Sequence, residues 1–254
     1  MTGSVTAGSE AVEPIRCEVT DRIAVVTIDR TARRNALNLD ALHRLDDAVA
    51  SAVAGGAAAV VFRGEGGHFC AGADLKELED QSFDTRLRGV LERIATAPVP
   101  TFAAISGACM GLGMQLALAC DIRVATDDAY FGIPAGKLGL VVNHWTLQRL
   151  ALNLGFGAAR LMVLTAETFT SDDAWRLGFT QVRGDLDAAV ALARRSADLA
   201  PLSLQGSKIG LNLVERALDE PEFNAAFERA WNSADLAEGR LAFAERRSPV
   251  FKGV

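Results

Sequence analysis

The sequence predicts an α/β fold, because short β-branched apolar runs alternate with helical patterns along the first half of the chain. Ile23 to Ile28 and Ala58 to Phe62 have the length and composition of buried strands. Between them, Asn38 or Asp40 can cap a helix whose apolar residues share one face. That face consists of Leu42, Leu45, Val49 and Val53. The chain therefore opens with a strand, a helix and a second strand.

The next part of the chain continues this alternation. Thr101 to Ile105 predicts a buried strand, Leu112 to Cys120 a buried helix, and Ile122 to Ala125 a further strand. The whole stretch from Ile94 to Cys120 is uncharged. Because prolines and glycines interrupt it, we interpret it as strand, loop and helix, and expect no membrane span.

Beyond Ser203 the pattern is only helical. Apolar residues recur there at the spacing of one helix face, as Phe223, Ala226, Phe227, Ala230 and Trp231. A face this wide needs a partner, which is either the body of the same chain or a neighbouring subunit. The sequence contains no linker or repeat that would mark a second independent domain.

Composition limits the functional classes. A chain of 254 residues that is 50% hydrophobic can bury a large core. The net charge of -6 argues against non-specific nucleic-acid binding. The four cysteines form no CxxC pair, and the first 14 residues lack the blocks of a signal peptide, so we expect a reducing, cytoplasmic setting. The sequence has no cluster with metal-ligand spacing, so we expect neither a metal nor a cofactor.

Four short segments suggest a family. They are residues 33–38, 69–76, 107–122 and 238–249. In order and spacing they resemble the crotonase (enoyl-CoA hydratase/isomerase) superfamily. The resemblance implies the crotonase-like spiral of ββα units that ClpP shares, assembled as trimers or dimers of trimers. We expect residues 1–200 to form the core with an acyl-CoA site, and residues 201–254 to form a helical oligomerisation region.

Two glycine-containing turns suit the binding of a thioester oxygen. Small residues at Gly72-Ala73 and from Gly107 to Gly113 let backbone N–H groups approach a ligand closely, and two such donors can form an oxyanion hole. By the resemblance, the donors are the amides of Ala73 and Leu112. Hydratases of the family usually have glycine at the second position, so leucine can narrow the pocket. Taken alone, these segments would be ordinary tight turns.

The resemblance also implies a coenzyme A thioester as the ligand or substrate. Arg30, Arg33, Arg34 and Lys76 are cations that could hold its phosphates, although isolated charges of this kind more often form a solvated face. The residues expected from the resemblance to contact coenzyme A are Arg34, Ala36, Leu37, Ala71, Leu75, Lys76, Phe243 and Arg246.

Hydratases of the family use two glutamates for proton transfer. Counted along the motifs, these positions are Gln115 and Ala135. A carboxamide forms hydrogen bonds but exchanges no proton near neutral pH, and a methyl group does neither. Because one positioned acid or base contributes on the order of 100- to 10,000-fold in rate, we do not expect normal hydratase turnover.

Other residues near these positions leave two functions open. His144 is the nearest ionisable side chain, and we expect it to line an acyl pocket with Gln115 and Ala135. We expect Trp145 to line or plug the same pocket. The first function is an acyl-CoA-binding protein of fatty acid or lipid metabolism with little or no hydratase activity. The second is an active enoyl-CoA hydratase/isomerase-family enzyme of unassigned reaction that uses other residues.

Overall fold

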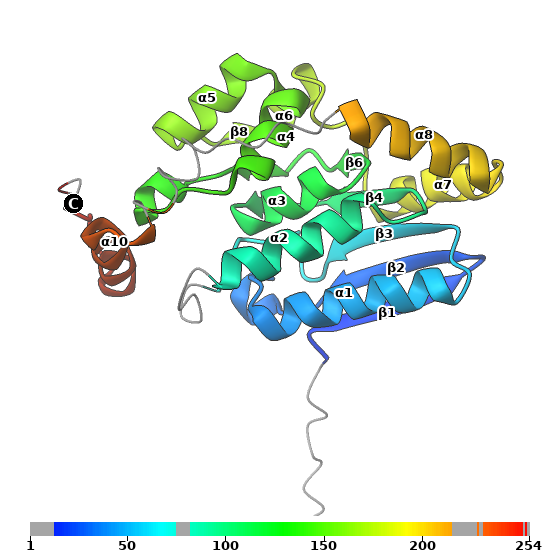
Figure 1. Ribbon diagram of the computed structural model, residues 1–254, viewed down its shortest axis with the longest axis horizontal. Coiled ribbons are helices and arrows are strands. Elements are labelled where there is room, and N and C mark those ends of the chain that lie inside the picture. The colour runs from blue at the N-terminus through cyan, green and yellow to red at the C-terminus, as the bar shows by residue number, and fades with distance from the viewer. Residues whose placement is uncertain (1–12, 75–81, 215–227, 229–230, 251, 253–254) are drawn as a thin grey trace, which may run out of the picture.

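The computed structural model describes residues 13–74, 82–214, 228, 231–250 and 252 (Figure 1). It confirms the predicted α/β class, because a six-stranded sheet lies between helices. The strand order is β1-β2-β3-β4-β6-β9, and only the first pair is antiparallel. The strands are β1 (Ile15–Thr20), β2 (Ile23–Ile28), β3 (Ala59–Gly64), β4 (Thr101–Ile105), β6 (Ile122–Ala125) and β9 (Val182–Arg183).

Three of the predicted strands have the expected bounds, namely β2, β4 and β6, and the fourth begins one residue later as β3. A second, three-stranded sheet was not predicted. It consists of β5 (Ala108–Met110), β7 (Tyr130–Gly132) and β8 (Phe169–Thr170). Strands of two or three residues give no periodic pattern of their own, because their pairing depends on partners elsewhere in the fold.

Side chains of the central strands alternate between two cores. In β3, Phe62 belongs to the larger core, which includes residues of three helices on one face of the sheet (Figure 1). Its neighbour Val61 belongs to a smaller core, which includes Ala189 and Ala193. This alternation is the period of two expected of a strand buried on both faces. The covering helices are α1 (Leu39–Ala54), α2 (Ser82–Ala95) and α3 (Leu112–Ala119) on one face, and α7 (Leu186–Ala197) on the other.

The predicted first helix is confirmed as α1. Of the two predicted caps, Asn38 is the residue that precedes it, and its side chain accepts a hydrogen bond from the amide of Ala41. Leu42, Leu45 and Val49 are buried, as the apolar spacing predicts. The cap and the apolar stripe together fix where α1 begins and which face it turns toward the core.

Helix α3 begins directly after β5 and packs against the chain near residue 70. A Cβ added to Gly113 would lie 2.2 Å from the carbonyl oxygen of Cys70, so only glycine fits there. Gly111 precedes the helix with a φ of 53°, and a Cβ there would lie 3.7 Å from Cα of Gly72. The close packing of α3 therefore brings the two glycine turns into contact.

The second half of the described chain is mainly helical. Near its end, α10 packs on the short helix η2, because Cβ atoms added to Gly139 and Gly239 would lie 2.4 Å and 2.3 Å from the carbonyl oxygens of Asp235 and Leu138. The elements outside the sheets are η1 (Thr31–Arg33), η2 (Ala135–Leu138), α4 (His144–Leu154), α5 (Phe156–Thr165), α6 (Ser171–Arg176), α8 (Pro201–Val214) and α10 (Ala234–Glu245).

Most of the predicted carboxy-terminal apolar stripe lies outside the described residues, namely Phe223, Ala226, Phe227 and Ala230. Trp231 is described. Its indole packs on the larger core, and Nε1 donates a hydrogen bond to the carbonyl oxygen of Val141 at 3.2 Å. Of the two partners that the sequence left open, Trp231 therefore contacts its own chain. In the part of the chain that the structure describes, no helix combines the length and hydropathy needed to cross a bilayer.

Candidate functional site

A cavity of about 480 Å³ lies beside the two glycine turns. Its volume falls within the range of about 300 to 1,000 Å³ that small-molecule sites occupy. It is lined by the turn at 71–74, by α2 and α3, by residues 133–142, and by Trp231 and Phe243 from the carboxy-terminal region. The lining residues are Arg33, Ala36, Ala71, Gly72, Ala73, Asp74, Phe83, Asp84, Leu87, Gly111, Leu112, Gln115, Ile133, Pro134, Ala135, Lys137, Leu138, Leu140, Val141, Val142, Trp231 and Phe243.

The two amides predicted to bind a thioester oxygen belong to one part of this cavity. Ala73 and Leu112 both line it, each following a glycine with positive φ, which is 130° at Gly72 and 53° at Gly111. Neither backbone N–H donates to an acceptor among the described residues. Two unpaired donors beside one cavity are what the stabilisation of a carbonyl oxygen requires.

Both positions that the resemblance gives to glutamates also line the cavity. Gln115 lies one turn into α3, and the hydroxyl of Thr146 donates a hydrogen bond to its Oε1 at 2.9 Å. This bond leaves the two N–H groups of Gln115 Nε2 without an acceptor in the described part of the chain. Ala135 is the first residue of η2 and contributes only a methyl group. Neither side chain can transfer a proton near neutral pH.

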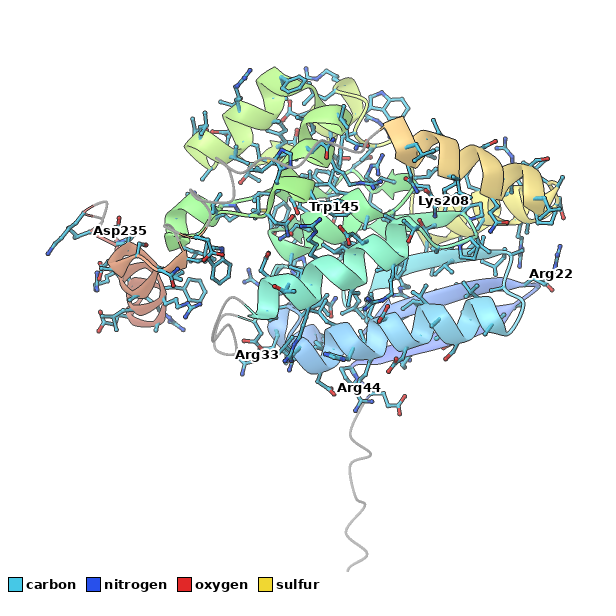
Figure 2. All side chains as sticks on the ribbon, in the orientation of Figure 1. Arg22, Arg33, Arg44, Trp145, Lys208 and Asp235 are labelled. Carbon is cyan, nitrogen blue, oxygen red and sulfur yellow. The ribbon has the colours of Figure 1, made fainter. Side chains whose placement is uncertain are left out.

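The other two residues predicted for the acyl pocket are not among the residues that line this cavity. His144 and Trp145 are the first residues of α4. Trp145 is half-buried, packs on the larger core, and has the guanidinium of Arg149 at 5.0 Å from its ring centroid (Figure 2). Arg149 Nε in turn donates to the carbonyl oxygen of Leu118. Trp145 thus packs where α4 meets α3.

Only some of the residues predicted to contact coenzyme A line the cavity. Ala36, Ala71 and Phe243 line the cavity. Leu37 is buried, and its backbone pairs with the turn through Gly72 and Asp74. The remaining predicted residues are Arg34 and Arg246, both exposed, and Leu75 and Lys76, which lie outside the described residues.

Cations stand at the edge of the cavity. Arg33 is exposed beside the first turn of α1 (Figure 2), and Lys137 is exposed on η2. An open hollow on the other side of η2 shares Lys137 and Phe243 with the cavity and is also lined by Arg246. Arg30 differs from these cations, because it forms an ion pair with Asp74 at 3.3 Å and donates to the carbonyl oxygen of Ala36. The sequence reasoning missed Lys137, which lies between the third and fourth motif segments.

Asp84 is a second residue that sequence reasoning missed. Its side chain lines the cavity from α2, and Asn143 Nδ2 donates a hydrogen bond to its Oδ1 at 3.0 Å. Burial raises the pKa of this carboxyl, while the bond from Asn143 and the charge of Arg88 oppose that shift. A sequence signal did exist, because Asp84 shares one helix face with the buried Leu87 and Leu91. A carboxylate on an apolar stripe is an informative exception.

The described residues contain no group of three or more His, Cys, Asp or Glu side chains that could hold a metal ion. They also provide no activated thiol beside the cavity. Burial raises the pKa of Cys70 to about 12, and its Sγ donates to the carbonyl oxygen of Gly72 at 3.5 Å. His68 Nδ1 accepts a hydrogen bond from the amide of Ala108. His68 and Cys70 therefore act in packing.

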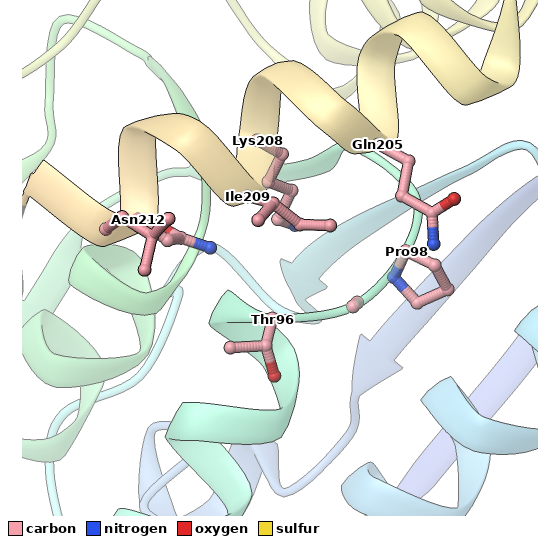
Figure 3. Close-up of a pocket in the computed structure, with 8 residues that line it drawn as sticks. Thr96, Pro98, Gln205, Lys208, Ile209 and Asn212 are labelled. Atoms are coloured by element: carbon pink, nitrogen blue, oxygen red, sulfur yellow. The ribbon is translucent and has the colours of Figure 1, made fainter.

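A smaller hollow of about 200 Å³ lies between the end of α2 and α8 (Figure 3). Two of its polar side chains, Lys208 and Asn212, already bond to the core. Lys208 Nζ lies 2.7 Å from Asp121 Oδ2 and donates to the carbonyl oxygen of Val99, and Asn212 Nδ2 donates to the carbonyl oxygen of Ala95. These bonds fix α8 to the core, so we assign this hollow to packing.

Comparison with known proteins identifies the family. The family model for enoyl-CoA hydratase/isomerase matches residues 18–254. A probable enoyl-CoA hydratase of Mycobacterium tuberculosis is 39% identical over 240 residues, which is 92% of this chain and 98% of that protein. A mitochondrial methylglutaconyl-CoA hydratase of Mus musculus is 33% identical, over 91% of this chain and 80% of that protein.

Solved structures agree with these sequence matches. The crystal structure of carnitinyl-CoA hydratase from Mycobacterium avium superimposes with a TM-score of 0.81 at 33% identity, covering 96% of this chain and all of that one. Methylmalonyl-CoA decarboxylase has the same fold, with a TM-score of 0.89 at 22% identity over 96% of this chain. The predicted crotonase-like fold is therefore confirmed, and the chain belongs to the enoyl-CoA hydratase/isomerase family within the crotonase superfamily.

Proposed function

We propose that this chain binds acyl-CoA, in fatty acid or lipid metabolism, and has little or no enoyl-CoA hydratase activity. The observation that carries the proposal is the pair Gln115 and Ala135, which line the cavity at the positions that the family resemblance gives to glutamates. The cavity retains two unpaired amides that can hold a thioester oxygen. Binding and oxyanion stabilisation therefore remain, while proton transfer by these two positions does not.

The same geometry suggests how the ligand lies. The thioester oxygen accepts from the amides of Ala73 and Leu112, and the acyl chain extends along Leu87 and the apolar loop that ends at Val142. The phosphates lie near Lys137 and, in the adjoining hollow, Arg246. Leu112 in place of the glycine usual in hydratases narrows the cavity beside the thioester.

Two measurements on the purified protein test this function. Calorimetry should detect binding of butyryl-CoA and octanoyl-CoA, while the hydration of crotonyl-CoA stays at background. The double variant Gln115→Glu, Ala135→Glu restores the two carboxylates and serves as the comparison for turnover. Robust hydration of crotonyl-CoA by the wild-type chain would reject the proposal. So would an absence of binding to both butyryl-CoA and octanoyl-CoA.

Asp84 favours the second candidate function, an active family enzyme of unassigned reaction. It is a carboxyl group of raised pKa beside the cavity, which suits it for proton transfer. A panel of acyl-CoA thioesters, assayed for any change in the acyl group, tests this alternative. Product formation by the wild-type chain that is lost in Asp84→Asn would favour the enzyme over the binding protein.

We also propose that the chain forms homotrimers or dimers of trimers in the cytoplasm, with residues 201–254 as the oligomerisation region. Exposed apolar side chains on α8 support an interface, since Leu202 is 81% exposed and Leu211 is 70% exposed. Light scattering should give the mass of at least three chains at micromolar concentration. A stable monomer would reject this assembly.

A further inference from the structure

Asp84 is a carboxylate that is only partly paired within a largely apolar cavity. Its Oδ1 accepts a hydrogen bond from Asn143 at 3.0 Å. Its Oδ2 has no partner among the described residues. Buried neighbours on the same helix, Phe83 and Leu87, limit the access of water. A carboxylate oxygen with limited access to water is stabilised by a ligand that donates a hydrogen bond to it.

The hydrogen bonds around Asn143 hold the carboxylate in a fixed orientation. Asn143 Oδ1 caps α4 by accepting from the amide of Thr146 at 3.0 Å, so its Nδ2 must face Asp84. The hydroxyl of the same Thr146 donates to Gln115 Oε1. These contacts leave an acceptor on Asp84 and donors on Gln115 beside the same cavity. A hydroxyl group on a ligand could donate a hydrogen bond to Asp84 or accept one from Gln115.

Within the described residues, no cation forms an ion pair with Asp84. Arg88 is on the next turn of α2, but its side chain is 54% exposed and pairs with Glu92 at 2.9 Å. Asp74 lines the cavity as a second carboxylate and is paired with Arg30. The exposed cations Arg33 and Lys137 line the cavity as well. An anionic group at the end of an acyl chain would therefore meet the charge of Asp84.

We propose that Asp84 determines acyl specificity: it accepts a hydrogen bond from a hydroxyl group on the acyl chain and repels acyl chains that carry a carboxylate. The inference rests on the proposed function, since it requires the cavity to hold the acyl chain of a thioester. It adds the chemical class that the cavity prefers, which is a hydroxyacyl thioester, and the class that it excludes, which is a carboxyacyl thioester.

Four six-carbon thioesters test the proposal by calorimetry near neutral pH. They are hexanoyl-CoA, 3-hydroxyhexanoyl-CoA, 6-hydroxyhexanoyl-CoA and adipoyl-CoA, which differ mainly in the polar group and its place. The wild-type chain should bind at least one hydroxylated ligand about tenfold more tightly than hexanoyl-CoA, as expected for a hydrogen bond to a charged acceptor. It should bind adipoyl-CoA at least about tenfold more weakly than hexanoyl-CoA.

Variants of Asp84 assign these differences to its carboxylate. Asp84→Leu should remove both the hydroxyl preference and the adipoyl penalty. Asp84→Asn keeps the shape and should remove the adipoyl penalty, so it carries the test if the leucine variant fails to fold. Asp187→Asn removes one exposed carboxylate on α7 and should keep the wild-type pattern.

The outcomes separate this inference from the proposed function. If the wild-type chain binds the thioesters and the Asp84 variants keep its affinity ratios, the role of Asp84 is rejected and acyl-CoA binding stands. A wild-type chain that shows no preference among the four ligands would also reject it. If the wild-type chain binds none of them, acyl-CoA binding itself fails, and the specificity of Asp84 fails with it.

Discussion

The hydroxyl of Thr146 donates a hydrogen bond to Oε1 of Gln115 at 2.9 Å, and both side chains are buried. The bond joins α4 to α3 beside the cavity that Gln115 lines. In this arrangement the hydroxyl proton points to the carbonyl oxygen of the carboxamide. The Nε2 donors of Gln115 are thereby left for the cavity.

Removing this hydroxyl should lower stability. Thr146→Val keeps the shape but leaves the buried Oε1 of Gln115 without its donor, so we expect the free energy of unfolding to fall by about 1 to 3 kcal/mol. Urea denaturation measures the loss. Thr96→Val is the matched control, because the hydroxyl of Thr96 bonds the carbonyl oxygen of Glu92 at an exposed site where water can replace it. Equal losses in the two variants would contradict the importance of the buried bond.

Gly113 should not tolerate alanine. The added methyl group would lie 2.2 Å from the carbonyl oxygen of Cys70, so α3 must shift away from the glycine turn that it contacts. Overpacking of this kind costs about 1 to 3 kcal/mol, and we expect the amide of Leu112 to move with the helix, which weakens acyl-CoA binding. A denaturant melt and calorimetry with octanoyl-CoA measure the two effects.

The control for Gly113 is Gly206→Ala on α8. No atom lies within 4 Å of a Cβ added at Gly206. Alanine is the better helix former, so this variant should be more stable than the wild type by about 0.5 to 1 kcal/mol. A loss of stability at Gly206 with none at Gly113 would contradict the packing described for α3.

Much of the fold was predictable from local sequence. Strands β2, β4 and β6 are buried, and their runs of apolar and β-branched residues predict this without knowledge of the neighbouring strands. The small sheet of β5, β7 and β8 was not predictable in this way. Each of its strands has only two or three residues, so tertiary partners rather than local preference select the extended conformation.

The site was predictable in part, for a related reason. Ala73, Leu112 and Gln115 belong to the ordered motifs, Ala135 follows the third of them, and the fold brings all four residues to one cavity. The place of Asp84 beside them depends on how α2 crosses α3, which no single motif encodes. His144 and Trp145 follow the cap residue Asn143 as the first residues of α4, and neither is among the residues that line the cavity.

Thiol reactivity should distinguish the exposed cysteine from the buried ones. Cys17 is exposed, whereas Cys70, Cys109 and Cys120 are buried. Burial raises the pKa of Cys70 and of Cys120 to about 12, so their reactive thiolate forms are scarce near neutral pH. A chromogenic disulfide reagent should therefore label one thiol in the native protein and all four in denaturant. Cys17→Ser should abolish the native labelling, and rapid reaction of a second thiol in the folded chain would contradict this burial.

The pH dependence of stability should reveal the carboxyl of Asp84. Its pKa in the folded chain is raised above 3.8, mainly by burial, so the unfolded chain releases this proton at a lower pH than the folded chain does. Between the unfolded and the folded pKa, the folded chain therefore holds more protons than the unfolded chain does. The contribution of Asp84 to stability falls as pH rises through this range, until the folded pKa is passed. The charged groups that face or line the same cavity are Arg88, Asp74, Arg33 and Lys137.

Comparison with Asp84→Asn isolates this contribution, because the neutral amide does not titrate and the other charged groups are unchanged. The free energy of unfolding of the wild-type chain minus that of the variant should decrease as pH rises above 3.8, and should level off once the folded pKa of Asp84 is passed. Urea titrations at a series of pH values measure this difference. A difference that increases with pH over this range would mean that the carboxylate is stabilised in the fold. That result would contradict the desolvation of Asp84 beside the cavity.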